Sequence, residues 1–476
     1  MNAPIQRLYL LFLVLFAVLV YFTSRNAVFD ATALRDNTLN KRTLLEEQQI
    51  HRGTIRAADG TILARSVKQR GGVYTRRYPT NGLFSHPIGY SFTTLGRAGL
   101  ERSRNDALTG KRNELTSVLD QLRGKRQTGD SVRTTLDTAA QRVAYSALAG
   151  RKGAVVALDP RNGAVTVMAS EPQYDPNALR GPGTYSRLAN DNANRPLVNR
   201  ATQFGYAPGS TFKVVTATAA IDSGRYTPQS TVDGKNGVKI SGVPLQNDFN
   251  QSFGPIDLTT ALAKSVNTVY AQVAERLGKA TLRKYMVRFG FGSKPQLDYP
   301  KEQMSVSGEY RNGNLLEPTS RFVDVGRMGI GQDKLAVTPL QMAEVAAAVA
   351  NRGKLMKPHL TDRIVDVDGR TVERVTPQVQ STVMKPSTSS AVTAMMEGVV
   401  NSGTGTQAQI PGVRVAGKTG TAETQIGKTT NNVWFIAFAP ADNPRVAIAV
   451  TMEHQVGFGG DVAAPVAKAV MESLLK

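Results

Sequence analysis

A serine and a lysine, Ser210 and Lys213, lie three residues apart in the segment YAPGSTFKVVTATAAIDSG (Tyr206–Gly224). Residues three apart on a helix share a face, so the lysine amine can reach the serine hydroxyl. A serine hydroxyl is a weak nucleophile until a neighbouring base accepts its proton. Burial among the apolar residues that follow would lower the pKa of Lys213 enough for it to be that base. The break at Pro208-Gly209 puts Ser210 at the helix start, where free backbone N–H groups can stabilise an oxyanion.

Two more polar segments lie downstream. AKSVNTVY contains a hydroxyl and an amide two residues apart, those of Ser265 and Asn267. RVAGKTGTAE contains an amine and two hydroxyls on an expected strand, with a glycine that lets a substrate backbone approach closely: Lys418, Thr419, Gly420 and Thr421. Each motif is weak alone, because S-x-x-K recurs at the C-terminus and S-x-N recurs at two other places. Together and in this order they form one strong pattern.

The order S-x-x-K, S-x-N and K-T-G is typical of penicillin-binding proteins and serine β-lactamases. The chain closely resembles class B penicillin-binding proteins from about residue 50 onward, and its size is nearest the actinobacterial penicillin-binding protein A type. Outside the three motifs the resemblance rests on RGTIRAADGTILARS, GRAGLE, GAVVALDPRNGAV, YDPN and WFIAFAPADNP. One departure is that Ala57-Ala58-Asp59-Gly60 stands where Asp-Arg-Asn-Gly is commoner.

The resemblance implies a role for each residue of the first two motifs. Ser210 is expected to be the nucleophile that becomes acylated, and Lys213 to be its base. Ser265 is expected to relay a proton to the leaving amine, and Asn267 to bind the donor peptide.

The resemblance also implies the roles of the strand residues. Lys418 is expected to keep the site electropositive, while Thr419 and Thr421 hold the terminal carboxylate of the substrate. The backbone N–H groups of Ser210 and Thr421 would form the oxyanion hole. We expect Lys213 to be neutral at rest, because its helix is apolar. We expect Lys418 to stay charged, because it would face the water-filled cleft.

The activity implied by the resemblance is that of a peptidoglycan D,D-transpeptidase that β-lactams acylate. Such an enzyme attacks the D-Ala-D-Ala bond of a stem peptide, expels D-Ala, and passes the acyl group to an amine on a neighbouring stem. A D,D-carboxypeptidase would use water as the acceptor, and an acylated β-lactam-sensing receptor would not turn over. A class A β-lactamase is disfavoured because it needs neither an anchor nor a pedestal, and a receptor because seven residues before Leu8 leave no room for an output domain.

Composition excludes several other kinds of site. The 476-residue chain has no cysteine, which excludes disulfides, thiol catalysis and cysteine–zinc sites. Its four histidines lie far apart without metal-ligand spacing, so we expect no metal and no cofactor. The net charge of +21 suits an anionic neighbour, but the charges are scattered as on a solvated surface, so nucleic acid is not an expected partner.

The N-terminus carries an unbroken apolar run, LYLLFLVLFAVLVYF, from Leu8 to Phe22. We expect residues 8–23 to be an uncleaved anchor in the plasma membrane, with residues 1–7 in the cytoplasm and the catalytic domain outside it. The alternative is a signal peptide cleaved after Ala33, a site that lies rather far beyond the apolar run.

Three regions are expected after the anchor: a stalk (24–50), a loop-rich pedestal (51–131) and a transpeptidase domain (132–476). Asp59-Gly60 predicts a hairpin in the pedestal, and Asp137 predicts the start of a helix. Strand–turn–strand patterns at both ends of the last region, with helical segments between them, predict an α+β fold of the penicillin-binding and serine β-lactamase type.

The resemblance implies one protein partner. The pedestal region has no Glu-rich candidate for a glycosyltransferase site, so glycan polymerisation must come from another protein. A multispanning membrane glycosyltransferase of the shape, elongation, division and sporulation class is expected to bind the anchor and the pedestal.

Overall fold

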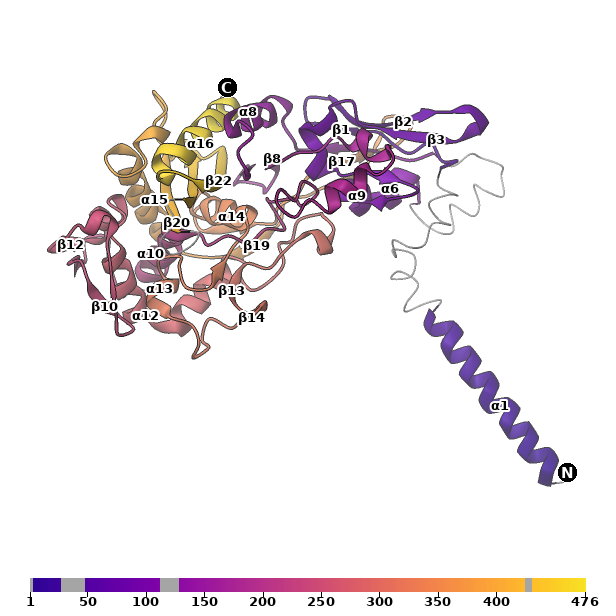
Figure 1. Ribbon diagram of the computed structural model, residues 1–476, viewed down its shortest axis with the longest axis horizontal. Helices are drawn as coiled ribbons and strands as arrows, with labels where there is room; N and C mark the ends of the chain where they lie inside the picture. The colour runs from indigo at the N-terminus through magenta and orange to yellow at the C-terminus, as the bar shows by residue number, and fades with distance from the viewer. Residues whose placement is uncertain (1–2, 27–47, 112–127, 424–429) are drawn as a thin grey trace.

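The computed structural model describes residues 3–26, 48–111, 128–423 and 430–476 (Figure 1). The apolar run forms one helix, α1 (Ala3–Ser24), none of whose residues is buried against the rest of the protein. It is long and apolar enough to cross a membrane, and no other helix of the described residues is. The span predicted for residues 8–23 therefore lies within α1.

The catalytic region is built on an antiparallel sheet of five strands in the order β20-β21-β22-β7-β8. Its strands are β7 (Gly153–Leu158), β8 (Val165–Glu171), β20 (Ala416–Glu423), β21 (Asn431–Ala439) and β22 (Val446–Gln455). The predicted hairpins β7–β8 and β21–β22 are confirmed. Strand β7 and residues 433–439 of β21 and 446–450 of β22 are apolar at consecutive positions instead of alternating, because helices cover both faces of the sheet.

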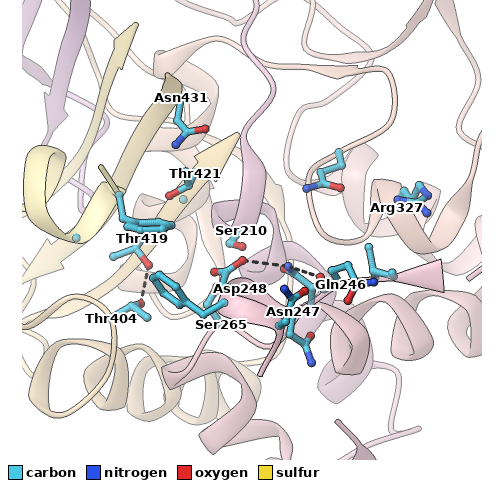
Figure 2. Close-up of a pocket in the computed structure, with 18 of the residues that line it drawn as sticks. Ser210, Gln246, Asn247, Asp248, Ser265, Arg327, Thr404, Thr419, Thr421 and Asn431 are labelled. Atoms are coloured by element: carbon cyan, nitrogen blue, oxygen red, sulfur yellow. Dashed lines mark hydrogen bonds between the residues drawn. The ribbon is translucent and has the colours of Figure 1, made fainter. Parts of the chain in front are cut away.

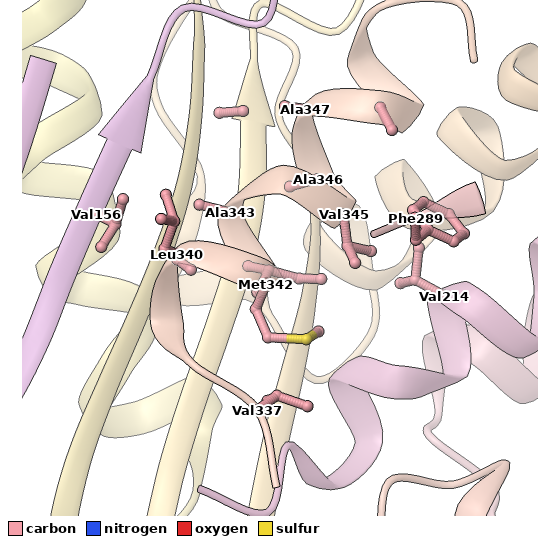
Figure 3. Packing of buried hydrophobic residues seen from close by; sticks show 14 of the residues in the cluster. Val156, Val214, Phe289, Val337, Leu340, Met342, Ala343, Val345, Ala346 and Ala347 are labelled. Carbon is pink, nitrogen blue, oxygen red and sulfur yellow. The ribbon is translucent and has the colours of Figure 1, made fainter. Parts of the chain in front are cut away.

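One face of this sheet carries α8 (Thr138–Leu148) and α16 (Gly459–Leu475), and the other carries α14 (Pro339–Ala350). The predicted start of α8 is confirmed, since the Asp137 side chain accepts a hydrogen bond from the Ala140 N–H. All 12 residues of α14 are buried, and their small side chains fit the middle of the core. Figure 3 shows Leu340 of α14 beside Val156 of the sheet, and Val345 beside Val214 of the next layer.

That next layer brings the three motifs together. It contains α10 (Lys213–Asp222), which packs on both α12 (Asn267–Arg288) and α15 (Pro386–Asn401), and α11 (Leu258–Ala263), which packs against α15. Helix α15 also packs on β20, the edge strand that carries K-T-G. The architecture is the predicted α+β fold, and its packing brings residues 209–212 and Ser265 to β20 at the edge of the sheet.

A second sheet of six strands, in the order β18-β17-β6-β1-β2-β3, forms the pedestal. Its strands are β1 (Ile55–Arg56), β2 (Ile62–Lys68), β3 (Tyr74–Arg77), β6 (Ser131–Thr134), β17 (Thr361–Val365) and β18 (Thr371–Arg374). The predicted hairpin is the β1–β2 pair, with Gly60 at a φ of +92° in its turn.

The pedestal sheet crosses the predicted domain boundary between residues 131 and 132. That boundary falls inside β6, and β17 and β18 come from the range predicted to be catalytic. Two strands more than 200 residues from the pedestal complete its sheet, so the two regions are not separated at one point in the chain. Sequence patterns could not show this, because the pairing is set by tertiary contacts.

The pedestal also contains a buried ion-pair network around Glu101. Its carboxylate, fully buried, accepts from Arg52 Nε at 2.8 Å and from Arg76 Nε at 2.5 Å. Burial by itself would raise the pKa of Glu101, but the charges of Arg76 and Arg52 and their hydrogen bonds lower it below its usual value. The network joins Arg76 of β3 to Glu101 of α5 (Gly99–Ser103) and to Arg52, which precedes β1.

We expect Glu101→Gln to lower the free energy of unfolding by about 3 kcal/mol, because the amide removes the buried negative charge that pairs with Arg52 and Arg76. The matched control is Glu317→Gln in the exposed Arg283–Glu317 pair, which should change stability by less than about 1 kcal/mol. Thermal unfolding of both variants in detergent measures the difference. Equal losses of stability in the two variants would show that the buried Glu101 network stabilises the fold no more than an exposed ion pair does.

Candidate active site

Ser210 lies in a single 3₁₀ turn, η5 (Gly209–Phe212), that leads directly into α10. The predicted helix thus begins with a 3₁₀ turn, which keeps residues three apart on one face. Gly209 has a φ of +53°, its N–H donates to the Gly331 carbonyl, and a Cβ on it would lie 2.6 Å from the Thr421 carbonyl oxygen. Only glycine fits there, and its close contact brings η5 against β20.

Lys213 begins α10 and is fully buried. Its Nζ donates to the Ser265 carbonyl at 2.7 Å, to Asn267 Oδ1 at 2.6 Å and to Ser265 Oγ at 3.3 Å. Ser265 has a φ of +59°, a left-handed conformation uncommon for residues other than glycine. In this turn between α11 and α12, both oxygens of Ser265 contact the same amine.

Lys418 reaches the same hydroxyl from the strand. Its Nζ lies 3.0 Å from Ser265 Oγ and also donates to the carbonyl and the hydroxyl of Thr419. The Thr419 hydroxyl is 2.6 Å from that of Thr404, and the Thr421 hydroxyl accepts from the Gly459 N–H. Ser265 Oγ therefore lies between two lysine amines that are far apart in the sequence.

Both lysines have lowered pKa values. Burial lowers the pKa of Lys213 to about 7, although the negative charge of Asp248 opposes this. Burial, and then the positive charge of Lys213, hold the pKa of Lys418 well below its usual value, again against Asp248. Two ammonium groups around one hydroxyl repel each other, so the pair gives up a proton readily.

We predicted that Lys418 would face water and stay charged for that reason, and this prediction is wrong. Lys418 is fully buried under the cleft, as Lys213 is, and its pKa is lowered instead of kept at its ordinary value. The alternation of a strand puts this side chain on the face of β20 against which η5 packs, and there its amine donates to Ser265 Oγ. Neither lysine lines the cleft itself.

A cleft of about 800 Å³ lies beside Ser265, whose hydroxyl both lysines contact, and Figure 2 shows residues that line it. Six of the predicted site residues line it: Ser210, Ser265, Asn267, Thr419, Gly420 and Thr421. With the two lysines beneath, the structure brings all eight predicted residues to one site. Gly420 permits this, because a Cβ on it would lie 2.7 Å from the Pro208 carbonyl oxygen.

Sequence reasoning missed other residues of the cleft. They include Asp248, Phe249, Phe458, Asp461, Arg327, Gln332, Thr404 and Asn431. None belongs to a motif with recognisable spacing, so only the packing assigns them to the site. Among the described residues, no group of three His, Asp or Glu side chains is arranged to hold a metal ion.

Comparison with known proteins agrees with this geometry. Residues 153–472 match the model for the penicillin binding protein transpeptidase domain, and residues 52–132 match the penicillin binding protein A dimerisation domain. Peptidoglycan D,D-transpeptidase PbpA of Mycolicibacterium smegmatis is 33% identical over 100% of this chain and 99% of its own. Stage V sporulation protein D of Bacillus subtilis is 30% identical over 85% of this chain and 65% of its own.

A solved structure agrees as well. The ceftriaxone acyl-enzyme complex of penicillin-binding protein A from Mycobacterium tuberculosis has a TM-score of 0.82 and 32% identity, and the match covers 91% of this chain and 100% of that one. The family match covers more than half of the chain, and PbpA of Mycolicibacterium smegmatis matches it along its whole length. The fold, the three motifs around one cleft and these comparisons show that the chain belongs to the penicillin-binding protein family, with a transpeptidase domain and a penicillin-binding protein A type pedestal.

Proposed function

We propose that this protein is a peptidoglycan D,D-transpeptidase that cross-links stem peptides through a serine acyl-enzyme and is acylated by β-lactams. The observation that carries the proposal is the Ser265 hydroxyl, held by the Lys213 and Lys418 amines beside Ser210. Relatives named D,D-transpeptidases and a relative solved as a β-lactam acyl-enzyme support it.

The test uses a stem peptide ending in D-Ala-D-Ala, with and without an acceptor amine, and mass analysis of enzyme and products. We expect D-Ala release and a cross-linked product when the acceptor is present. Hydrolysis alone would indicate a D,D-carboxypeptidase, and a stable acyl-enzyme that releases no product would indicate a sensing receptor.

In the proposed mechanism Ser210 Oγ attacks the donor carbonyl and its proton passes to Lys213 Nζ. Among the described residues, Lys213 donates to Ser265 and Asn267 and not to Ser210, so the productive hydrogen bond would tighten when substrate binds. Ser265 then passes a proton to the leaving D-Ala amine as the peptide bond breaks. The products of this half-reaction are the Ser210 ester and free D-Ala.

In this proposal the K-T-G residues of β20, together with Asn267, bind the donor, and two backbone N–H groups stabilise the oxyanion. Thr419 and Thr421 would hold the donor carboxylate, and Asn267 would hold the donor amide. The backbone N–H groups of Ser210 and Thr421 would stabilise the oxyanion, which the close approach of η5 to β20 supports. Lys418 would keep Ser265 oriented and add positive charge beneath the carboxylate.

We expect acylation by penicillin G to accelerate as pH rises through about 7, because a lysine base works only when deprotonated and burial lowers the pKa of Lys213 to about 7. The rate constant should level off once the pair of lysines has lost its first proton. Asp248→Asn should move the rise to lower pH, because the negative charge of Asp248 raises both lysine pKa values. Intact-mass time courses at several pH values measure this, and equal rates at about pH 5.5 and 8.5 would contradict it.

Helix α1 is proposed to anchor the protein in the plasma membrane, with the pedestal and the catalytic domain outside the cytoplasm. Its length and hydropathy support a span, and the substrate lies outside the cytoplasm. Protease added outside intact cells should cut the catalytic domain but leave α1 in the membrane. A mature chain beginning at Leu34 in most molecules would indicate a cleaved signal instead.

The proposed partner is a multispanning membrane glycosyltransferase, because a transpeptidase needs polymerised glycan beside it. The support is analogy with the family. Co-purification of such an enzyme should be lost when α1 and the segment 52–63 are replaced. Indifference to both replacements would contradict the proposal.

A further inference from the structure

The cleft contains a carboxylate that the mechanism above does not use. Asp248 is exposed, lines the cleft with Ser210 and Ser265, and accepts a hydrogen bond from Asn267 Nδ2 at 3.3 Å. Figure 2 shows its side chain grouped with Ser210 and Ser265. Asp461 is the other carboxylate among the described residues that line the cleft, and it lies in the first turn of α16. The charge of Asp248 is the one that affects the two lysines.

The loop that carries Asp248 is held rigidly. Asn247 is buried, its amide donates to the carbonyls of Gly234 and Gln251, and its Oδ1 accepts from the Thr268 N–H of α12. This anchor ties the loop to the helix that also carries Asn267. The carboxylate of Asp248 is therefore presented by a preorganised backbone and not by a free loop tip.

The next residue, Phe249, has an unusual backbone and an unusual environment. Its φ is +57° and that of Asn250 is +54°, a conformation that is an outlier for a bulky side chain. Its ring is 75% exposed and also lines the cleft. The ring of Phe458, from the start of α16, lies 5.2 Å away. A fold that holds an aromatic ring out of its core at the cost of backbone strain indicates a binding role at this position.

A carboxylate beside an exposed aromatic ring suits one chemical class of ligand, a primary ammonium at the end of an aliphatic arm. The carboxylate pairs with the charge, and the ring packs on the methylene groups and attracts the cation. The acceptor of a transpeptidase is such a group. It must reach the Ser210 ester through this cleft, and a fixed anionic group there raises its local concentration and orients it.

We propose that Asp248 and Phe249 form the acceptor subsite, in which Asp248 binds the acceptor ammonium and Phe249 packs on its aliphatic arm. This inference rests on the proposed transpeptidase function. The bound ammonium releases one proton to solvent, and the free amine adds to the carbonyl of the Ser210 ester. The second proton passes to Ser210 Oγ as the ester bond breaks, which yields the amide cross-link and free Ser210.

The test measures how the acyl-enzyme partitions between an amine and water. The full chain in detergent is given a D-Ala-D-Ala stem-peptide donor and a stem-peptide acceptor whose third side chain ends in a primary amine. The ratio of cross-linked to hydrolysed product is independent of the acylation rate, because both products come from one intermediate. Asp248→Asn should lower this ratio about tenfold at low acceptor concentration, and raise the acceptor KM by the same factor.

Further variants, and the dependence of the acceptor KM on ionic strength, distinguish a binding role of Asp248 and Phe249 from a structural role. In the wild type the acceptor KM should rise with ionic strength, whereas in Asp248→Asn it should not. Asp248→Glu should recover most of the affinity, and Phe249→Leu should raise the acceptor KM several-fold. Asp442→Asn is the control, an exposed carboxylate in the turn between β21 and β22 and outside the cleft, and it should leave both the ratio and the KM unchanged.

Three outcomes would overturn the inference. An unchanged ratio and an unchanged salt dependence in Asp248→Asn would show that Asp248 does not bind the acceptor. Failure of Asp248→Asn to form an acyl-enzyme at about pH 8.5, where Lys213 is largely deprotonated, would assign Asp248 to acylation instead. A wild-type acyl-enzyme that only hydrolyses would contradict the proposed function itself, and the inference with it.

Discussion

Ser210→Ala is expected to abolish acyl-enzyme formation with both penicillin G and a D-Ala-D-Ala stem peptide. No other described hydroxyl combines a place in the cleft with a position three residues before a buried lysine, so loss of Ser210 removes the only candidate nucleophile there. The loss should be at least about 10⁴-fold, since removing a nucleophile eliminates the covalent route. Intact mass after incubation with penicillin G measures it.

The matched control is Ser473→Ala, because Ser473 begins the second S-x-x-K match, at the C-terminus. That match lies in the last turns of α16, outside the cleft, and the variant should be acylated at the wild-type rate. Unchanged thermal unfolding shows that Ser210→Ala is folded. A mass adduct that survives in folded Ser210→Ala would refute the assignment of the nucleophile.

Lys213→Arg is expected to slow acylation by about 10²–10⁴-fold, the usual contribution of a general base. The guanidinium keeps the positive charge but cannot accept a proton near neutral pH. The substitution therefore separates a base from an electrostatic anchor. Stopped-flow or mass-based acylation kinetics at about pH 8 measure the loss, at a pH where the wild-type lysine is largely neutral.

Two variants accompany Lys213→Arg. Lys213→Met keeps the length and burial of the side chain without its charge, and it should lose acylation while retaining the fold. Lys264→Arg changes an exposed lysine next to Ser265 and should acylate normally. Acylation of folded Lys213→Arg at a near wild-type rate would show that Lys213 is not the base.

The position of Ser265 explains why the protonation of Lys213 and that of Lys418 depend on each other. Its hydroxyl is 3.3 Å from Lys213 Nζ and 3.0 Å from Lys418 Nζ, so a proton on one amine raises the cost of a proton on the other. The pH steps of acylation therefore belong to the pair. Asp248 acts on both amines, which makes it the described residue outside the three motifs with the most direct influence on the site.

The sequence by itself determined the features that depend on short segments. The apolar run predicted α1, the turn residues predicted the hairpins β1–β2, β7–β8 and β21–β22, and Asp137 predicted the start of α8. The order of the three motifs predicted which residues meet in the site and the family to which the chain belongs. Backbone propensity, capping and motif identity are local properties, so these predictions needed no knowledge of the packing.

Only the tertiary structure decided the environment of those residues. The K-T-G motif could not reveal that Lys418 is buried and that its pKa is lowered, because this depends on η5, which packs on β20, and on Ser265, which contacts the Lys418 amine from 153 residues earlier. Likewise, the pedestal sheet takes β17 and β18 from the far side of the predicted boundary, and the loop of Asp248 and Phe249 joins the cleft through an asparagine bound to α12. Burial, charge coupling and strand pairing each depend on residues that are distant in the sequence. Those residues come together only when the chain has folded.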